Sequence, residues 1–142
     1  MRRALLALAL CVALTGCAAK VAPVTPTPPN SAQTTVARLN NTVADADQAA
    51  VKTVIALRDA GKLSQANTTV IENWLALVAT TDKAIGMILA KSEAWDVQKV
   101  EILTLLATTT APTIATTIDP GASAVIAQIQ TLIAQIRTQV TQ

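Results

Sequence analysis

This chain of 142 residues contains no histidine, phenylalanine or tyrosine, and its only aromatic residues are Trp74 and Trp95. Without histidine, it lacks the usual general acid or base near neutral pH and the commonest transition-metal ligand. Only 14% of its residues are charged. Catalysis would have to depend on carboxylates, lysines and hydroxyls, and a core would have to be built from Ala, Val, Ile and Leu. We therefore expect neither an enzyme nor a bound cofactor or metal.

Residues 1–16 have the pattern of an export signal. Arg2 and Arg3 give a basic start, and a run of small apolar residues follows up to residue 14. A segment of this kind is too short for a stable membrane span and is removed from the mature protein. We therefore leave residues 1–16 out of the fold prediction.

Leu14, Thr15, Gly16 and Cys17 resemble the lipobox of bacterial lipoproteins. This resemblance covers only the first segment and implies nothing about the fold that follows. It implies that Cys17 is acylated and that signal peptidase II cuts between Gly16 and Cys17. Several acyl chains hold a protein on a bilayer stably, whereas one chain binds only reversibly. An ordinary secretory signal and an uncleaved N-terminal anchor are the two alternatives.

The residue after the cysteine bears on location. In lipoproteins of bacteria with two membranes, an aspartate at this place retains the protein at the inner membrane, and here Ala18 follows Cys17. The resemblance therefore implies an outer-membrane lipoprotein that faces the periplasm. In a source without an outer membrane, it implies the plasma membrane.

Removal of the signal changes the charge and the cysteine count. The chain has 11 basic and 9 acidic residues, and two of the basic ones are Arg2 and Arg3. The remaining charges balance, so no basic surface argues for nucleic acid as a partner. Cys11 leaves with the signal and Cys17 would carry lipid, so we expect no disulfide within the mature chain.

The rest of the chain divides into a linker and one domain. Residues 17–30 contain the acceptor cysteine and a stretch with Pro23, Pro26, Pro28 and Pro29. Because proline lacks an amide donor and has a fixed φ, this stretch predicts a semi-extended tether. Residues 31–142 are close to the commonest size of a single domain.

Helical periodicity begins at Ser31. The first helix is expected to run to about residue 60, where Gly61 can adopt the left-handed conformation that ends many helices. Ser64 is an N-cap candidate for a second helix, and Ser92 for a third. The second helix could also continue through Lys91 with only a bend.

The C-terminal part of the domain predicts one more helix. Threonines at 108–110 weaken the third helix, and Pro112 should kink or end it. Residues 113–118 are compatible with a helical turn or a loop. Asp119 as N-cap and Pro120 at the first helical position then indicate the start of a fourth helix.

Each predicted helix has one apolar stripe, with residues three or four apart. Period-two alternation, which would indicate strands, is absent over any useful length. The stripes predict an all-α fold, an antiparallel four-helix bundle. The stripe of the first helix is Val36, Leu39, Val43, Ala46, Ala50, Val54 and Leu57, and that of the second is Val70, Trp74, Leu77 or Val78, Thr81, Ile85 and Ile88. The stripe of the third helix is Trp95, Ile102, Leu103 and Leu106, and that of the fourth is Ala122, Val125, Ile129, Leu132, Ile136 and Val140.

Candidate sites are few. Trp74 and Trp95 lie on or beside their apolar stripes, so they are either core residues or contact residues at an interface. Asp45 and Asp47 are two apart on a helix and point about 200° away from each other, so they cannot converge on one cation.

Two spacings predict surface ion pairs. Asp96 and Lys99 are three residues apart, as are Asp59 and Lys62. On a helix, residues three apart are neighbours, and an exposed pair contributes only a few tenths of a kcal/mol. Neither pair is expected to be catalytic.

These observations favour a noncatalytic interaction or structural lipoprotein of the cell envelope, which contacts a membrane through its lipid and binds a protein partner or itself. Two alternatives stay open. The bundle could carry an apolar ligand or lipid between its helices. It could also be a phage-derived or lysis-related protein that disturbs membranes through the poorly charged residues 102–136.

Overall fold

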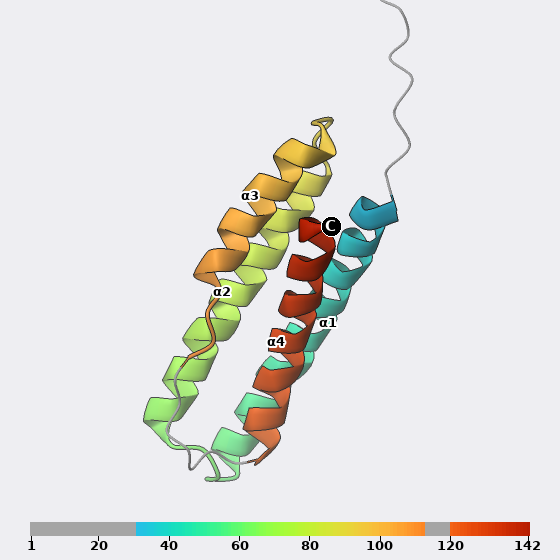
Figure 1. The fold of residues 1–142 in the computed structure, drawn as a ribbon. Coiled ribbons are helices and arrows are strands. Elements are labelled where there is room, and N and C mark those ends of the chain that lie inside the picture. Colours follow the sequence, from blue (N-terminus) through green and yellow to red (C-terminus); the bar gives the residue numbers. More distant parts are fainter. Residues whose placement is uncertain (1–30, 113–119) are drawn as a thin grey trace, which may run out of the picture.

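The computed structural model describes residues 31–112 and 120–142. These residues form four helices, α1 (Ser31–Asp59), α2 (Gln65–Leu89), α3 (Trp95–Thr108) and α4 (Pro120–Thr141), and contain no strand. Successive helices run in opposite directions (Figure 1). The predicted all-α antiparallel four-helix bundle is therefore confirmed.

The helices form a ring in chain order. α1 packs against α2 and α4, and α3 packs against the same two helices from the other side. α3 has 14 residues, whereas α1, α2 and α4 have 29, 25 and 22. At about 1.5 Å per residue, α3 covers roughly 21 Å of its longer neighbours. It lies along the half of the bundle next to the α2–α3 turn (Figure 1).

The α1–α2 turn follows the prediction closely. Gly61 has a φ of 67°, and the Lys62 amide donates to the Leu57 carbonyl oxygen at 2.9 Å, so a left-handed glycine ends α1. The Ser64 hydroxyl oxygen accepts a hydrogen bond from the Asn67 amide at 3.2 Å and caps α2. Both predicted capping residues are confirmed, and α1 ends one residue before the expected position.

The α2–α3 turn corrects one prediction. α2 ends at Leu89 and α3 begins at Trp95, so the two helices are separate. The N-cap of α3 is Ala94, without a side-chain cap, and the prediction of Ser92 was wrong. The Gln98 side chain donates to the Lys91 carbonyl oxygen at 3.0 Å, which fixes the turn and leaves the first helical turn to start after Ala94.

α4 begins at Pro120, as the sequence predicts. The proposed cap Asp119 and the open segment 113–118 lie outside the described residues. At the end of α3, the C-cap is Thr109, in agreement with the expected weakening through the threonine run.

The core consists of seams in which buried residues are spaced alternately by four and three. This spacing is the knobs-into-holes pattern of coiled coils and helix bundles. The seam of α4 is Ala122, Ile126, Ile129, Ile133, Ile136 and Val140. The seam of α1 is Val36, Asn40, Val43, Asp47, Ala50 and Val54. The predicted stripe members Leu39, Ala46 and Leu57 are only partly buried, because they flank this seam. On α4 the predicted members Val125 and Leu132 are also only partly buried, and Ile126 and Ile133 occupy the seam instead.

On α2 one member of the predicted stripe is not in the seam, and the buried Thr68, Ile71 and Leu75 were not in the stripe. Val70 is 42% exposed, so its assignment to the core was wrong, and Ile71 is buried instead. The seam passes through Ile71, Leu75 and Val78, each of which is fully buried. Of the two candidates at 77 and 78, Val78 is therefore the core residue.

Candidate functional site

A polar strip lies in the seam between α1 and α2. Asn40 and Asp47 occupy seam positions of α1 and are only 6% and 8% exposed. The Asn40 Nδ2 donates to the main-chain oxygen of Asp82 on α2 at 3.0 Å. One amide and two carboxyl side chains therefore interrupt a mainly apolar helix interface.

Three acceptor atoms of the polar strip receive no hydrogen bond. The Oδ1 atoms of Asn40, Asp47 and Asp82 are all buried and have no hydrogen-bond partner. An amide oxygen and ionised carboxylates can only accept, so these three atoms cannot satisfy one another. Leaving a buried acceptor unsatisfied costs about 1–3 kcal/mol. The polar strip is therefore the least satisfied part of the described interior.

Burial raises the pKa of Asp47, and the negative charge of Asp82 raises it further. Burial alone raises the pKa of Asp82. Both effects disfavour the ionised form, because a charge loses hydration in the interface and meets a like charge. A protonated carboxyl group can donate a hydrogen bond, and a donor is what the three unpartnered oxygen atoms of the strip lack.

A small cavity lies beside the polar strip in the middle of the bundle. Its volume is about 10 Å³, which is room for about one water molecule. Helices α1, α2, α3 and α4 all contribute to its wall, with Asn40, Asp82, Thr81 and Thr109 as the polar lining residues. The Thr109 hydroxyl donates to the Thr81 hydroxyl at 3.3 Å. The cavity has no space for an organic substrate.

A larger hollow of about 220 Å³ opens to the surface between residues 109–111 and α4. Its polar lining comes from Thr109, Thr110, Gln130 and Arg137. The Arg137 guanidinium donates to the Leu106 carbonyl oxygen at 3.0 Å, near the C-terminus of α3, and so closes that helix end. No carboxylate or lysine lines this hollow, so its residues do not pair a nucleophile with a base.

A second buried polar group, by contrast, is fully satisfied. The Gln98 side chain accepts from the Gln33 Nε2 at 2.9 Å and donates to the Lys91 carbonyl oxygen at 3.0 Å. These bonds join the start of α1, the α2–α3 turn and the start of α3. Gln98 therefore has a structural role that its polar character alone did not reveal.

The sequence-predicted site residues are distributed as follows. Trp74 is buried in the core, with its indole N–H unpartnered, and Trp95 is half-buried against the core. Asp45 is exposed whereas Asp47 is buried, so the predicted divergence of these carboxylates is confirmed. Cys17 and the cleavage residue Gly16 lie outside the described residues.

One of the two predicted ion pairs is present. Lys99 Nζ lies 3.5 Å from Asp96 Oδ1, as expected. Asp59 instead contacts its neighbour Arg58 at 3.1 Å, and Arg58 also reaches Glu72 of α2 at 3.6 Å. Because Lys62 follows the left-handed Gly61, it no longer continues the helix on which the i,i+3 spacing was based.

The described residues contain no cluster of three or more His, Cys, Asp or Glu side chains able to hold a metal ion. Among the described helices, none combines the length and the hydropathy that a membrane span requires. Comparison of the chain with family models, curated proteins and solved structures finds no match. Function must therefore be argued from the chain itself.

Sequence reasoning missed the polar strip, although a signal for it exists. Val36, Asn40, Val43 and Asp47 already follow the alternating spacing of four and three in the sequence. A search for polar residues inside such a heptad pattern would have placed Asn40 and Asp47 in the interface. A stripe drawn only through apolar residues passes beside them.

Proposed function

We propose that this protein is a membrane-anchored bacterial lipoprotein, and that its helical bundle is a noncatalytic interaction or structural module of the cell envelope. The observation that carries the proposal is the lipobox-like sequence at residues 14–17. The bundle supports it because its interior is filled mostly by apolar side chains, which leave little space for a substrate between the helices.

In this proposal Cys17 carries the acyl chains and residues 18–30 connect it to the start of α1 at Ser31. Two or three acyl chains give stable attachment to one bilayer. Because Ala18 follows the cysteine, the outer membrane is the proposed site in a bacterium with two membranes. The plasma membrane takes its place in a bacterium with one.

The bundle would bind a protein partner or a second copy of itself through its outer surface. Trp95 is the better of the two tryptophan candidates for such a contact, because part of its side chain reaches the surface. Trp74 is buried in the core, so it would meet a partner only if the helices separated.

The two other functions receive less support from the structure. A carrier of apolar ligands needs a space between its helices, and the cavity that all four helices line has a volume of only about 10 Å³. The hollow of about 220 Å³ opens at the surface beside residues 109–111. A membrane-disrupting protein would need apolar segments that are free to enter the bilayer, whereas Ile102, Leu106 and Ile129 of α3 and α4 are buried in the core.

The first experiment is an intact mass measurement on protein purified from bacterial membranes. We expect a chain that begins at Cys17 and carries acyl chains. The Cys17→Ala variant should lose both the acyl mass and retention in the membrane. The matched control is Cys11→Ala, which alters the other cysteine and should leave the mature protein unchanged. An unlipidated wild-type protein would contradict the anchor.

The interaction role needs a separate measurement. Light scattering on the purified protein and crosslinking in cells should reveal a second copy or a partner protein. A monomer that recovers no crosslinked protein would count against the interaction role and would leave the anchor unaffected.

A further inference from the structure

One end of the bundle carries the most exposed large apolar side chains of the described residues. Met87, in the last turn of α2, is 58% exposed, and Val97 and Val100, in the first two turns of α3, are 50% and 65% exposed. Val97 and Val100 are three residues apart and so lie on one helix face. We call these three residues and the intervening turn 90–94 the tip. The other exposed large apolar residues of α1 and α2 are 37–42% exposed.

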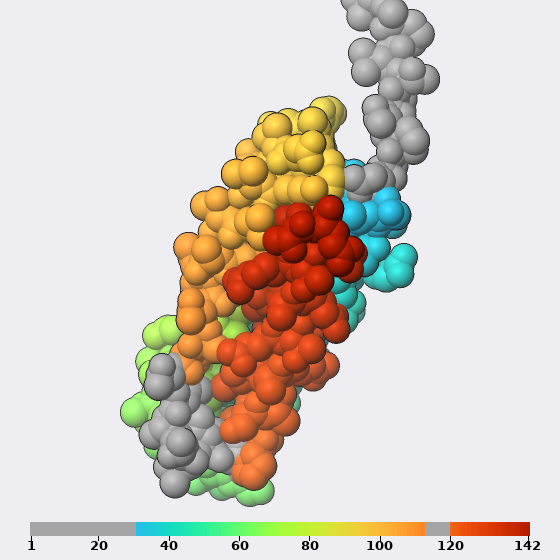
Figure 2. Space-filling view, in the orientation of Figure 1, coloured from blue at the N-terminus to red at the C-terminus, as the bar shows by residue number. Residues whose placement is uncertain are grey.

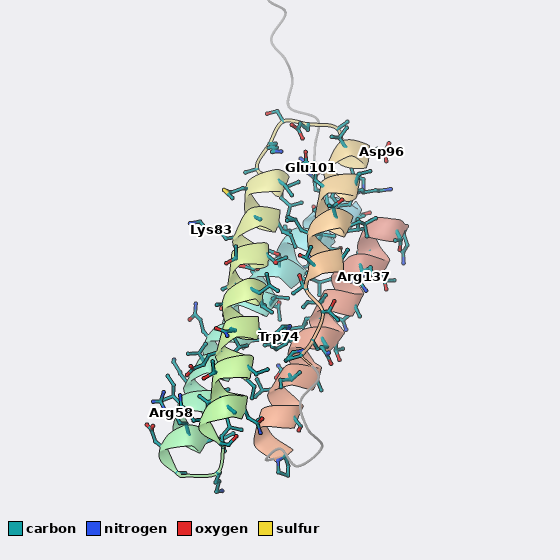
Figure 3. The ribbon with its side chains drawn as sticks, turned by 90° about the vertical axis from the view of Figure 1, so that its left-hand side faces the viewer. Arg58, Trp74, Lys83, Asp96, Glu101 and Arg137 are labelled. Carbon is teal, nitrogen blue, oxygen red and sulfur yellow. The ribbon has the colours of Figure 1, made fainter. Side chains whose placement is uncertain are left out.

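The tip projects from the bundle. In Figure 1 the α2–α3 turn extends beyond the start of α1 and the end of α4, and Figure 3 shows the same overhang after a turn of 90°. In the space-filling view the yellow tip stands clear of the red and blue ends (Figure 2). Helices α1 and α4 therefore do not cover the tip.

The chain that precedes the bundle joins it at this same end. α1 begins at Ser31, beside the tip, and residues 17–30 come before it (Figure 1). Fully extended, residues 17–30 reach at most about 50 Å. The bundle itself is about 37 Å long along α2. Because this tether can be longer than the bundle, it does not fix the orientation, but it attaches the lipid of Cys17 to the end of the bundle that carries the tip.

The ion pairs in and beside the tip involve two lysines and three carboxylates, so one negative charge is in excess. Lys91 Nζ lies 2.8 Å from Glu101 and 3.7 Å from Glu93, and Lys99 contacts Asp96 at 3.5 Å. The tip therefore offers no free basic patch to anionic headgroups. Apolar contact remains as its means of binding, together with the half-buried Trp95, a residue type that favours the membrane–water interface.

We infer that the tip rests on the bilayer that anchors Cys17, with Met87, Val97 and Val100 entering the headgroup boundary. This inference rests on the proposed function. Three half-exposed side chains are too few to hold a free protein on a membrane. A tether raises the effective concentration of the tip at the bilayer, so a weak contact is enough. The α1–α2 turn then faces away from the membrane.

The test uses the full-length lipidated protein in vesicles of phosphatidylethanolamine and phosphatidylglycerol that contain a nitroxide-labelled lipid. Single variants Val97→Cys and Val100→Cys carry an environment-sensitive fluorophore on the new thiol. The matched control is Val70→Cys, which changes an exposed valine near the opposite end of α2. Positions 70 and 87 are about 25 Å apart along the helix. Circular dichroism checks that each variant keeps its helical content.

We expect quenching at positions 97 and 100 to exceed that at position 70 by at least about twofold, because interfacial residues lie within about 10 Å of the headgroup boundary. A fluorophore on Met87→Cys should also be quenched. The additional substitutions Val97→Asp and Val100→Asp, made together, should abolish the quenching at position 87. The double variant Val51→Asp/Ile55→Asp, which changes exposed residues of α1, should keep it.

Equal quenching at all positions in a protein whose mass shows acyl chains overturns this inference and leaves the proposed anchor standing. The same Val97→Cys variant can carry a crosslinker in place of the fluorophore. A crosslink to another protein or to a second copy, without quenching at position 97, overturns the inference in the same way. A mass without acyl chains overturns the proposed anchor and this inference together.

Discussion

Replacing Asp47 by asparagine should stabilise the folded protein at neutral pH. Asp47 lies in the α1 seam with an unpartnered Oδ1, and Asp82, whose charge acts on Asp47 across the interface, has an unpartnered Oδ1 as well. An asparagine keeps the shape, removes the charge and brings an amide donor. One new hydrogen bond contributes about 0.5–1.5 kcal/mol. We therefore expect a total gain of about 1 kcal/mol, in the middle of this range.

The gain should depend on pH with a definite sign. Burial and then the charge of Asp82 raise the pKa of Asp47 in the folded protein above its ordinary value of 3.8. The folded state therefore binds a proton more readily than the unfolded state does. This contribution to stability is fully present below pH 3.8 and is lost as the pH rises through the raised pKa. The advantage of Asp47→Asn should thus be largest at pH 7 and should shrink on acidification.

Urea unfolding followed by circular dichroism at several pH values measures both effects. For a small domain, about 1 kcal/mol corresponds to a midpoint shift of roughly 0.5 M urea. The matched control is Asp45→Asn, which removes the same charge two residues away at an exposed position and should change stability by less than about 0.5 kcal/mol. The reasoning is refuted if both variants behave alike, or if the gain of Asp47→Asn increases as the pH falls.

Three further substitutions test the fold. Ile129 is fully buried in the α4 seam, so Ile129→Ala should cost about 3 kcal/mol in urea unfolding, whereas Ile55→Ala at an exposed position should cost less than about 1 kcal/mol; equal costs would contradict the seam. Gly61→Ala should lower stability by about 1 kcal/mol through its φ of 67° alone, since no atom lies within 4 Å of an added Cβ; an unchanged melting temperature would argue against the left-handed turn. Ser64→Ala should cost about 1 kcal/mol by removing the N-cap, and Ser64→Asn should restore most of it, as thermal unfolding would show.

The helix boundaries were largely predictable because they depend on local chemistry. Gly61, Ser64 and Pro120 act through backbone conformation and short-range hydrogen bonds, and each lies where the sequence placed it. The prediction of Ser92 as the N-cap of α3 was wrong because Gln98, several positions away, donates a hydrogen bond to the turn, and α3 starts later. A bond of this kind is not visible in the residues next to the cap.

The seams were predictable only in part. Apolar periodicity gives the face of each helix, and it located Val43, Ile85 and Ile129 in the core. It could not distinguish Val70 from Ile71 on α2, because adjacent positions on a helix differ in burial only through the direction of the neighbouring helices. Asn40 and Asp47 were missed for a different reason, because the predicted stripe was drawn only through apolar residues and passed beside them.

By itself the sequence determined an all-α chain, the capping residues Gly61 and Ser64 of the first turn and a lipobox-like start at residues 14–17. These features follow from local periodicity, backbone preference and short motifs. Only the tertiary structure decided that Asp47 and Asp82 lie in one interface and that the α2–α3 tip projects beside the start of α1. Both depend on the register and relative length of helices far apart in the chain, which are set by how side chains from four helices fill a common core.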